Sequence, residues 1–366
     1  MGVFEQVTTM GHEQVLFCND KSSGLKAIIA IHDTTLGPAL GGCRMWDYES
    51  EEAALFDVLR LSRGMTYKAA ISDLNLGGGK AVIIGDPTKL KSEALFKTFG
   101  RFINSLGGRY ITAEDVNIKV SDMEMAATET RYVTGLTSRP GGSGDPSPVT
   151  AFGVYQGIRA AVKHKLGKST LSGLSIAVQG CGAVGTYLIE LLAKDGVKIY
   201  ASDIDEKKVR SVVEKYKAEP VDLAKVHALP VDVFSPCALG GILNDKSIPE
   251  LKTPIVAGGA NNQLLDEAVH AKALKDKGIL YSPDYVINAG GLINVYQELK
   301  GYNAEAARQK AANIYNTLAE VFKKADETGV TTIKASNEIA ERRLDSVRKM
   351  SHLRNSMDNQ IWVAPR

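Results

Sequence analysis

Residues 174–194 read LSIAVQGCGAVGTYLIELLAK, and this stretch decides the fold of the second half of the chain. An apolar run of strand length, residues 175–179, leads directly into the glycine pattern GxGxxG at residues 180–185. Residues 186–194 are compatible with a helix. Glycines at this spacing permit a tight turn, the close approach of a phosphate and close packing of helix on strand. The stretch therefore predicts a βαβ unit that binds a dinucleotide at the start of its helix.

An acidic residue, Asp203, follows the next expected strand and lies 23 residues after Gly180. A carboxylate at this position accepts hydrogen bonds from the hydroxyls of the adenosine ribose and repels the extra phosphate of NADP. The sequence therefore predicts NAD as the cofactor. The alternative is that Asp203 only caps the turn before Glu206. The predicted cofactor-binding residues of this motif are Gly180, Cys181, Gly182, Ala183, Val184, Gly185, Thr186 and Asp203.

Short apolar strands alternate with helical segments around this motif, as in parallel sheets built from βαβ units. We expect these strands at residues 174–179, 197–201, 231–234, 255–258 and 285–288, and a long helix over about 303–328 that ends at Gly329. Residues 138–148 hold three Gly, three Pro and three Ser, which indicates a hinge. The sequence therefore predicts a Rossmann-type NAD-binding domain at residues 149–330.

The first half of the chain is also α/β but has no dinucleotide pattern. We expect strands at residues 15–18, 25–33, 81–84 and 110–112, and helices at residues 51–65 and 92–106. These elements predict a first domain at residues 1–137.

Composition and charge exclude several classes of protein. The 366 residues include 44 basic and 42 acidic ones, a net charge of +2, which is too balanced for a dedicated nucleic-acid binder. No apolar run is long enough to span a membrane, and the N-terminus does not resemble a secretory signal. The four cysteines are scattered and the histidines never fall at i, i+4 spacing, so neither disulfides nor a metal site is expected. We expect a cytoplasmic protein.

Two lysines and an aspartate of the first half lie in unusual contexts. Lys68 ends GMTYK at residues 64–68, Lys80 follows three glycines and opens an apolar strand, and Asp115 ends TAED at residues 112–115. Burial disfavours a charged ammonium group, so a partly desolvated Lys80 can accept and return protons at cellular pH. Taken singly, each residue also has an ordinary interpretation: Lys68 as a cation at a helix end, Lys80 as a solvated residue after a glycine turn, and Asp115 as a helix N-cap.

Taken together, these motifs resemble the amino acid dehydrogenases of the glutamate, leucine, phenylalanine and valine group. The resemblance covers residues 13–343. It rests on six segments: TTLGPALGG (34–42), GMTYK (64–68), GGGK (77–80), PCALG (236–240), ANNQ (260–263) and PDYVINAGG (283–291).

The resemblance implies a role for each matching residue. Lys68 would grip the α-carboxylate of the substrate, Lys80 would be the catalytic lysine that activates water, and Asp115 would exchange protons with the amino nitrogen. The positions around the ribose and nicotinamide would be Thr150, Cys237, Ala238, Asn261 and Asn262, and Asn262 and Asn288 would help to hold the carboxamide and the substrate. A non-catalytic NAD-binding or regulatory protein would have no reason to keep Lys68, Lys80 and Asp115 together.

The resemblance also implies an assembly. The first domain would bind substrate and carry the subunit contacts, completed by C-terminal helices at residues 331–366, and a cleft would separate it from the NAD-binding domain. A homo-oligomer follows, an octamer by this resemblance, although aromatic-specific members can be dimers.

The expected side-chain pocket is apolar. Leu40 stands where glutamate-specific members have a lysine, and the other pocket positions are Gly41, Met65, Ala113, Leu292 and Val295. A buried glutamate carboxylate would stay unpaired there, whereas a branched aliphatic side chain gains from burial. We therefore expect NAD-dependent, reversible oxidative deamination of leucine, valine and isoleucine to 2-keto acids and ammonia. The alternative is an aromatic-specific member, because Leu292 and the segments at residues 10–18 and 290–296 are similar to such members.

Overall fold

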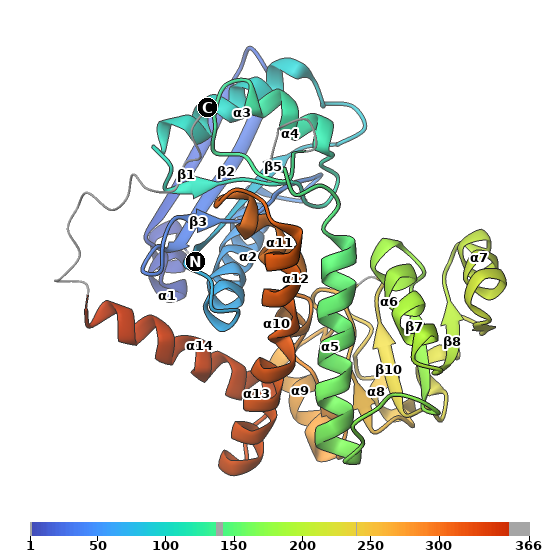
Figure 1. Cartoon of the computed structure of the whole chain (residues 1–366). Helices are drawn as coiled ribbons and strands as arrows, with labels where there is room; N and C mark the ends of the chain where they lie inside the picture. Colours follow the sequence, from blue (N-terminus) through green and yellow to red (C-terminus); the bar gives the residue numbers. More distant parts are fainter. Residues whose placement is uncertain (1, 137–141, 239, 351–366) are drawn as a thin grey trace. The chain divides into compact units, whose positions relative to one another are not determined.

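The computed structural model describes residues 2–136, 142–238 and 240–350 (Figure 1). Residues 138–141 of the expected hinge and residues 351–366 of the expected C-terminal helices lie outside this range. The chain divides into two compact units, Met1–Gly144 with Val295–Asn303 and Ala340–Arg366, and Asp145–Asn294 with Ala304–Ile339. Among the described residues, no helix is long and apolar enough to cross a membrane.

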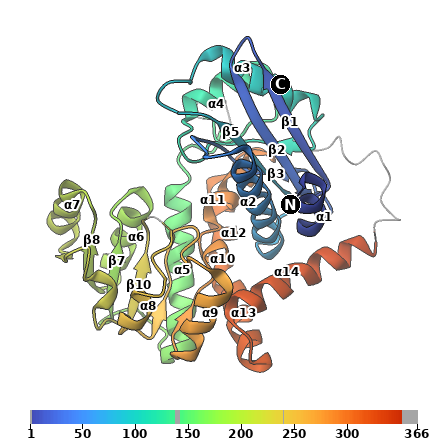
Figure 2. The same cartoon turned by 180° about the vertical axis from the view of Figure 1, so that it is seen from behind.

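The first unit is built on a six-stranded mixed sheet. Its strands run in the order β1-β2-β5-β3-β6, and β4 pairs with β5. β1 and β5 are antiparallel to β2, whereas β3 and β4 are parallel to β5; Figure 2 shows β1 and β2 side by side. The strands are β1 (Gln14–Asp20), β2 (Leu25–Asp33), β3 (Ala39–Leu40), β4 (Cys43–Trp46), β5 (Gly77–Ile84) and β6 (Tyr110–Ile111).

Helices cover both faces of this sheet because its central strands are apolar on both sides. Ile28, Ala30 and Val82 pack against α2 (Glu51–Ile71), while Ile29 and Ala81 belong to the core formed with α3. Ser50 and Ser92 cap α2 and α3 as side-chain acceptors. The other helices of this part are α1 (Val3–Met10), α3 (Glu93–Ser105) and α4 (Val120–Ala127).

Two sequence predictions in this unit are wrong at their boundaries. β5 begins at Gly77 instead of residue 81, so the three glycines lie inside the strand and not in a turn. α2 continues to Ile71 instead of ending near residue 65. The two elements meet in these additional residues, because a Cβ at Gly78 would collide with the backbone of Thr66 on α2. Gly78 lets the helix lie directly on the strand, and protein atoms occupy the space beside all three glycines, which is a packing role.

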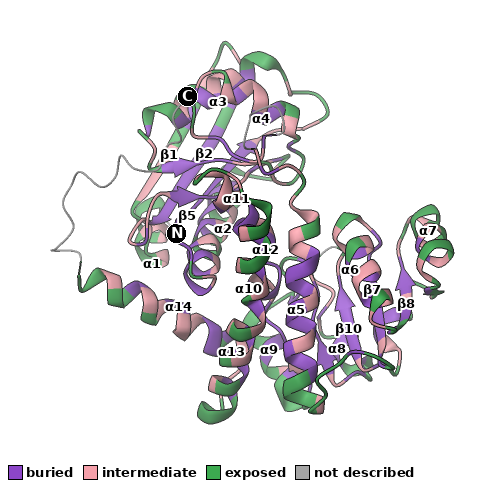
Figure 3. Cartoon of the chain, viewed as in Figure 1, coloured by how far each residue is buried: buried purple, intermediate pink, exposed green. Residues whose placement is uncertain are grey.

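The second unit contains a six-stranded sheet in the order β12-β11-β10-β7-β8-β9, all parallel. This is the order of a Rossmann sheet, with its topological switch between β7 and β10, so the predicted α/β fold class is confirmed. The strands are mostly buried (Figure 3). They are β7 (Ser175–Gln179), β8 (Lys198–Ser202), β9 (Glu219–Pro220), β10 (Val233–Pro236), β11 (Ile255–Val256) and β12 (Leu280–Tyr281).

Two further predictions fail around this sheet. Residues 285–288 form no strand, because Asp284–Ile287 is the short helix α10, and the expected last strand is β12 instead. The long helix over residues 303–328 is broken at Asn313 into α12 (Ala304–Ala312) and α13 (Ile314–Thr328). Gly329 does end α13 in the left-handed conformation, as expected. The remaining helices are α5 (Ser147–Leu166), α6 (Ala183–Lys194), α7 (Glu206–Tyr216), the 3₁₀ helix η1 (Val226–Ala228), α8 (Ser247–Glu250), α9 (Glu267–Asp276), α11 (Gly290–Glu298) and α14 (Thr332–Arg348).

Candidate active site

Lys80 and Asp115 form a buried ion pair in the first unit. Lys80 is the fourth residue of β5, and its side chain is only 8% exposed. Its Nζ lies 3.0 Å from Oδ2 of Asp115, which is on the loop after β6. The structure therefore brings together the two residues that the sequence analysis selected for proton transfer. The interpretation of Lys80 as a solvated residue after a turn is wrong.

Gly42 makes room for this pair. Its carbonyl accepts a hydrogen bond from the backbone of Ala81, which places it directly beside Lys80 across the β4–β5 pairing. A Cβ at Gly42 would lie 2.9 Å from the Cβ of Asp115 and 2.5 Å from the carbonyl oxygen of Glu114. Any side chain there would push the Asp115 loop away, so this glycine is required by the site itself.

The charge of Asp115 is set by three effects. Burial of the carboxyl raises its pKa, but the nearby ammonium of Lys80 and guanidinium of Arg44 lower it further, so that the net pKa lies below the ordinary value. Asp115 is thus a carboxylate at neutral pH. It can accept a proton and stabilise a cation beside it.

Sequence reasoning missed Arg44, which is also bound to Asp115. Arg44 is on β4, and its Nε lies 3.2 Å from Asp115 Oδ2, while its Nη1 lies 3.0 Å from Oδ2 of Asp57 on α2. The hydroxyl of Tyr48 donates to the same Asp57 oxygen at 2.7 Å. The signal that could have found Arg44 is a charged residue in the otherwise apolar strand CRMW, two positions after the Gly41-Gly42 pair.

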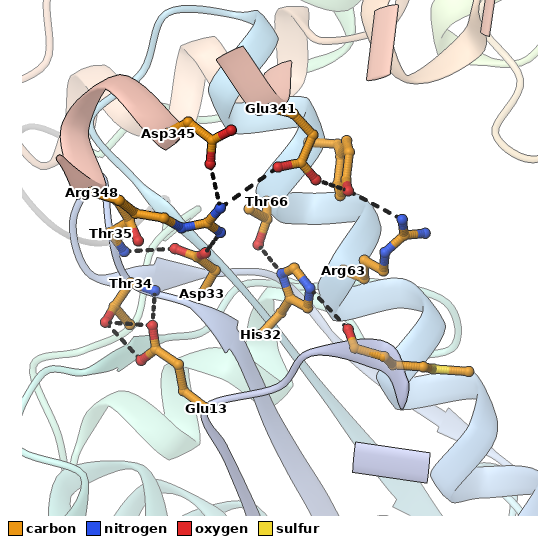
Figure 4. A network of polar contacts seen from close by, with 12 residues as sticks. Glu13, His32, Asp33, Thr34, Thr35, Arg63, Thr66, Glu341, Asp345 and Arg348 are labelled. Carbon is orange, nitrogen blue, oxygen red and sulfur yellow. Dashed lines mark hydrogen bonds and ion pairs between the residues drawn. The ribbon is translucent and has the colours of Figure 1, made fainter. Parts of the chain in front are cut away.

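Lys68, the predicted carboxylate-binding lysine, lies half-buried in the last turn of α2. The residues around it are fixed by the end of α14 that belongs to the first unit. Tyr67 donates a hydrogen bond to Glu341, and Arg343 donates to the carbonyl oxygens of Ala69 and Ala70 at 3.3 and 2.9 Å. Figure 4 shows the neighbouring contacts, in which Arg348 binds Asp33 and His32 binds Thr66.

The expected pocket residues of the first unit are partly brought together. Met65 lies against Gly41, because a Cβ on this glycine would lie 3.3 Å from Cγ of Met65. Leu40 on β3 is buried at 3% exposure, and Ala113 is half-buried, with its carbonyl accepting from Cys43 N at 2.8 Å. The two remaining pocket residues lie one turn apart on α11, where Leu292 is buried and Val295 is half-buried.

The glycine motif of the second unit forms the turn between β7 and α6. Gly180 has a φ of 103°, which a residue with a side chain rarely adopts. A Cβ at Gly185 would collide with the carbonyl of Gly180, so this glycine permits the close helix–strand packing. By contrast, a Cβ at Gly182 would meet no atom within 4 Å. The start of α6 therefore faces open space at Gly182. The first turns of this helix contain Ala183, Val184 and Thr186.

Asp203 follows β8 and lies at the glycine turn. Its carboxylate accepts hydrogen bonds from the backbone N–H of Cys181 at 2.7 Å and from that of Asp205 at 2.8 Å. The carboxylate thus also stabilises the local turn, as the alternative interpretation proposed. Each carboxylate oxygen has a second lone pair, so these bonds leave acceptor capacity for a ribose.

The other predicted cofactor residues of this unit gather near the same turn. A Cβ at Gly180 would lie 2.8 Å from the backbone of both Cys237 and Ala238, which follow β10. Asn288 donates to Asn261 Oδ1 at 2.6 Å and to the Gly259 carbonyl at 3.2 Å.

Two more of the predicted residues are positioned by backbone geometry. Asn262 has a φ of 52°, an uncommon backbone for a residue other than glycine and one that clusters at functional sites. Thr150 on α5 donates to the Pro146 carbonyl and packs against Gly290 and Gly291.

The comparisons with known proteins agree with this arrangement. Residues 12–132 match the dimerisation domain of the Glu/Leu/Phe/Val dehydrogenases, and residues 141–206 and 201–351 match the Glutamate/Leucine/Phenylalanine/Valine dehydrogenase model. The chain belongs to this family of amino acid dehydrogenases, enzymes that depend on a pyridine nucleotide, and the predicted family and enzyme class are confirmed.

The relatives of this chain are named for different amino acid substrates. The chain is 54% identical to a leucine dehydrogenase of Geobacillus stearothermophilus over 95% of each chain. It is 51% identical to an L-tryptophan dehydrogenase of Nostoc punctiforme over 95% of this chain and 98% of the other. The crystal structure of L-tryptophan dehydrogenase from Nostoc punctiforme matches with a TM-score of 0.85 at 50% identity, covering 95% of this chain and all of that one.

Proposed function

We propose that the protein catalyses the NAD-dependent, reversible oxidative deamination of branched-chain L-amino acids. In the forward direction the amino acid, NAD⁺ and water give the 2-keto acid, ammonium, NADH and a proton. The single observation that carries the proposal is the buried pair of Lys80 and Asp115, a lysine and a carboxylate 3.0 Å apart with little access to water. Such a pair has the donors and acceptors that this proton transfer needs.

Three residues of the first unit bind the substrate and transfer its protons. Lys68 binds the substrate carboxylate as a fixed cation. Lys80, once neutral, takes a proton from the water that attacks the imine carbon. Asp115 exchanges a proton with the amino nitrogen, which leaves as ammonia. In the reverse direction the same groups return these protons.

The residues of the second unit fit a dinucleotide. The open space at Gly182 and the N-terminus of α6 suit a pyrophosphate, and the Asp203 carboxylate suits a ribose with free hydroxyls. Cys237, Asn261 and Asn288 would lie around the nicotinamide, with Asn262 reaching the substrate. When bound, NAD⁺ supplies the hydride acceptor for the α-carbon.

The preference for aliphatic substrates rests on the buried Leu40 and on Met65 beside Gly41. A glutamate side chain would find no cation at Leu40, and burying its carboxylate unpaired costs several kcal/mol, on the order of 2–7. A leucine side chain gains roughly 1.5–3 kcal/mol from full burial. The identity to the leucine dehydrogenase of Geobacillus stearothermophilus points in the same direction.

The experiment is a panel of L-amino acids assayed by NAD reduction at alkaline pH. We expect leucine, valine and isoleucine to be good substrates, phenylalanine poor and glutamate negligible. A kcat/KM for phenylalanine or tryptophan above that for leucine would favour the aromatic alternative, which the relative from Nostoc punctiforme represents.

We further propose that the enzyme is a homo-oligomer, with an octamer as the favoured state and a dimer as the alternative. The support is the match of residues 12–132 to a dimerisation domain. Light scattering coupled to gel filtration separates an octamer, a dimer and a monomer by mass.

A further inference from the structure

Arg44 is a second, permanent cation on the carboxylate that faces Lys80. We infer that Arg44 is a positioning residue that keeps Asp115 ionised and in place while Lys80 gives up its proton. This inference rests on the proposed roles of Lys80 and Asp115. It assigns a task to a residue that binds the carboxylates of Asp115 and Asp57.

The geometry couples all three groups through one atom. Oδ2 of Asp115 lies 3.0 Å from the Lys80 ammonium and 3.2 Å from Arg44 Nε. An ion pair of Lys80 and Asp115 alone would hold the lysine in its charged form, because a neutral lysine would leave a buried carboxylate uncompensated. Arg44 stays charged at every accessible pH, so it compensates Asp115 whether Lys80 is protonated or not.

The guanidinium of Arg44 is itself held in place. Its Nη1 binds Asp57 Oδ2 at 3.0 Å, and the Tyr48 hydroxyl donates to the same oxygen at 2.7 Å. Arg44 and Asp57 are only 19% and 16% exposed, so solvent weakens these contacts little. The planar guanidinium therefore spans two carboxylates with separate nitrogens, which a lysine cannot reproduce.

Two buried side chains beside Asp115, a thiol and a phenol, stay neutral. Cys43 on β4 and Tyr110 on β6 both sense its charge, and burial raises the pKa of each well above its ordinary value. Glu114 on the same loop is exposed. Lys80 and Arg44 are thus the two cations that lower the pKa of Asp115.

Removal of Arg44 should change the proton affinity of the pair of Lys80 and Asp115 in one direction. Without it, the charge of Asp115 is compensated by Lys80 alone, so the coupled pair of Lys80 and Asp115 binds its protons more tightly. Oxidative deamination needs a neutral Lys80 and an ionised Asp115. Loss of the Arg44 charge favours the protonated form of the coupled pair, so the acidic limb of the pH profile of kcat/KM moves upward.

The test compares Arg44→Gln with Arg60→Gln in the full-length protein. Arg60 also binds Asp57, through Oδ1 at 3.2 Å, but it is 46% exposed and its ion pair is with Asp57 and not with Asp115, so it is the matched loss of one arginine. The measurement is kcat/KM for L-leucine with NAD from pH 7 to 11. We expect Arg44→Gln to lower kcat/KM by about tenfold near pH 8 and to move the acidic limb upward by about one pH unit, and Arg60→Gln to change neither.

An unshifted profile in Arg44→Gln, or an equal shift in Arg60→Gln, overturns the inference. If Arg44→Gln fails to fold, Arg44→Lys decides: it retains a charge but not the double contact, so a smaller upward shift supports the inference and no shift refutes it. Lys80→Ala, assayed in parallel, separates this outcome from failure of the proposed function. An active Lys80→Ala enzyme refutes the proposed function, whereas an inactive one with an unshifted Arg44→Gln profile refutes the role of Arg44 alone.

Discussion

Each of the two units contains a cluster of three glycines, and the two clusters differ in what surrounds them. The clusters are residues 77–79 in the first unit and Gly180, Gly182 and Gly185 in the second. In β5, a Cβ at Gly78 would collide with backbone and side-chain atoms of Thr66, and a Cβ at Gly79 would lie 2.6 Å from the ring of Tyr110. In the glycine motif of the second unit, Gly180 before α6 and Gly185 inside it are similarly confined, but a Cβ at Gly182 would meet nothing within 4 Å.

The space around the Cβ position distinguishes a glycine needed for packing from one that leaves room for a ligand. Gly78 lets α2 lie on β5, and protein atoms fill the space that side chains at all three glycines of β5 would occupy. The open position at Gly182 is instead space that a bound molecule can fill. Chemistry in the first unit and cofactor binding in the second should therefore respond to different substitutions.

The largest effect is expected for Lys80→Ala, which removes the proposed base and leaves the second unit unchanged. Turnover should fall by about 10²–10⁴-fold, the usual contribution of an acid–base group. Titration with NADH should show unchanged binding, because Lys80 lies in the first unit. More than about a tenth of the original kcat would be incompatible with this role.

A pair of glycine substitutions tests the comparison directly. Gly78→Ala places a methyl group against the Thr66 backbone, so we expect a loss of about 3 kcal/mol of stability or failure to fold. Gly182→Ala has free space and an ordinary φ of −70°, so its melting temperature should stay unchanged. Its affinity for NAD should fall by about tenfold, because the backbone no longer approaches the pyrophosphate closely. Equal melting temperatures for both variants would contradict the packing role of Gly78.

Acid should destabilise the first unit through two histidines near the glycines of β5. His12 binds Ser62 at 2.8 Å and packs edge-on against His32, which binds Thr66 at 2.8 Å. Burial and then the charge of His32 lower the pKa of His12 from 6.5 to about 4, and burial lowers that of His32. The unfolded chain therefore takes up protons first, and stability that is complete above pH 6.5 is lost as the pH falls toward 4.

We expect this loss to be on the order of 2 kcal/mol for His12, since the site is only partly buried. Urea unfolding at pH 7.5 and 5 measures it, with His12→Gln as the comparison variant. The same pH dependence with and without His12 would show that other groups are responsible.

Much of the second unit could be predicted from sequence because its signals are local. The strand, the glycine turn and the helix at residues 175–194 are adjacent in the chain, and the structure confirms them. The failure at residues 285–288 has a physical reason: a four-residue apolar run fits a buried helix turn as well as a strand. In the first unit, the sequence motifs indicate Lys80 and Asp115 as candidate catalytic residues. Their contact with each other and with Arg44 depends on how the strands pair, which the motifs do not show. Arg44 and Asp115 are 71 residues apart, and no local pattern indicates that they meet.

Cofactor choice should depend on Asp203 in the second unit. Its carboxylate would lie against the 2′-phosphate of NADP, and this like-charge contact should make NADP a poor cofactor. Asp203→Ser should narrow the ratio of kcat/KM for NAD over NADP by about 30-fold. Some affinity for NAD should also be lost, because the bond to Cys181 N disappears. A native enzyme that uses both cofactors equally would show that Asp203 does not contact the ribose.

The smallest expected effect concerns Ala113, and it decides between aliphatic and aromatic substrates. Ala113 carries a methyl group at a predicted pocket position, and its backbone is fixed by the bond from Cys43 N. A phenyl ring needs more room than an isobutyl group, so the methyl should crowd it. Ala113→Gly should raise kcat/KM for phenylalanine by about tenfold, the usual value of one methyl group in a pocket, and lower it for leucine. Leu292→Val is the control, because it also shortens an apolar side chain, at a different predicted pocket position on α11. If Leu292→Val raises activity on phenylalanine while Ala113→Gly does not, Ala113 does not line the side-chain pocket.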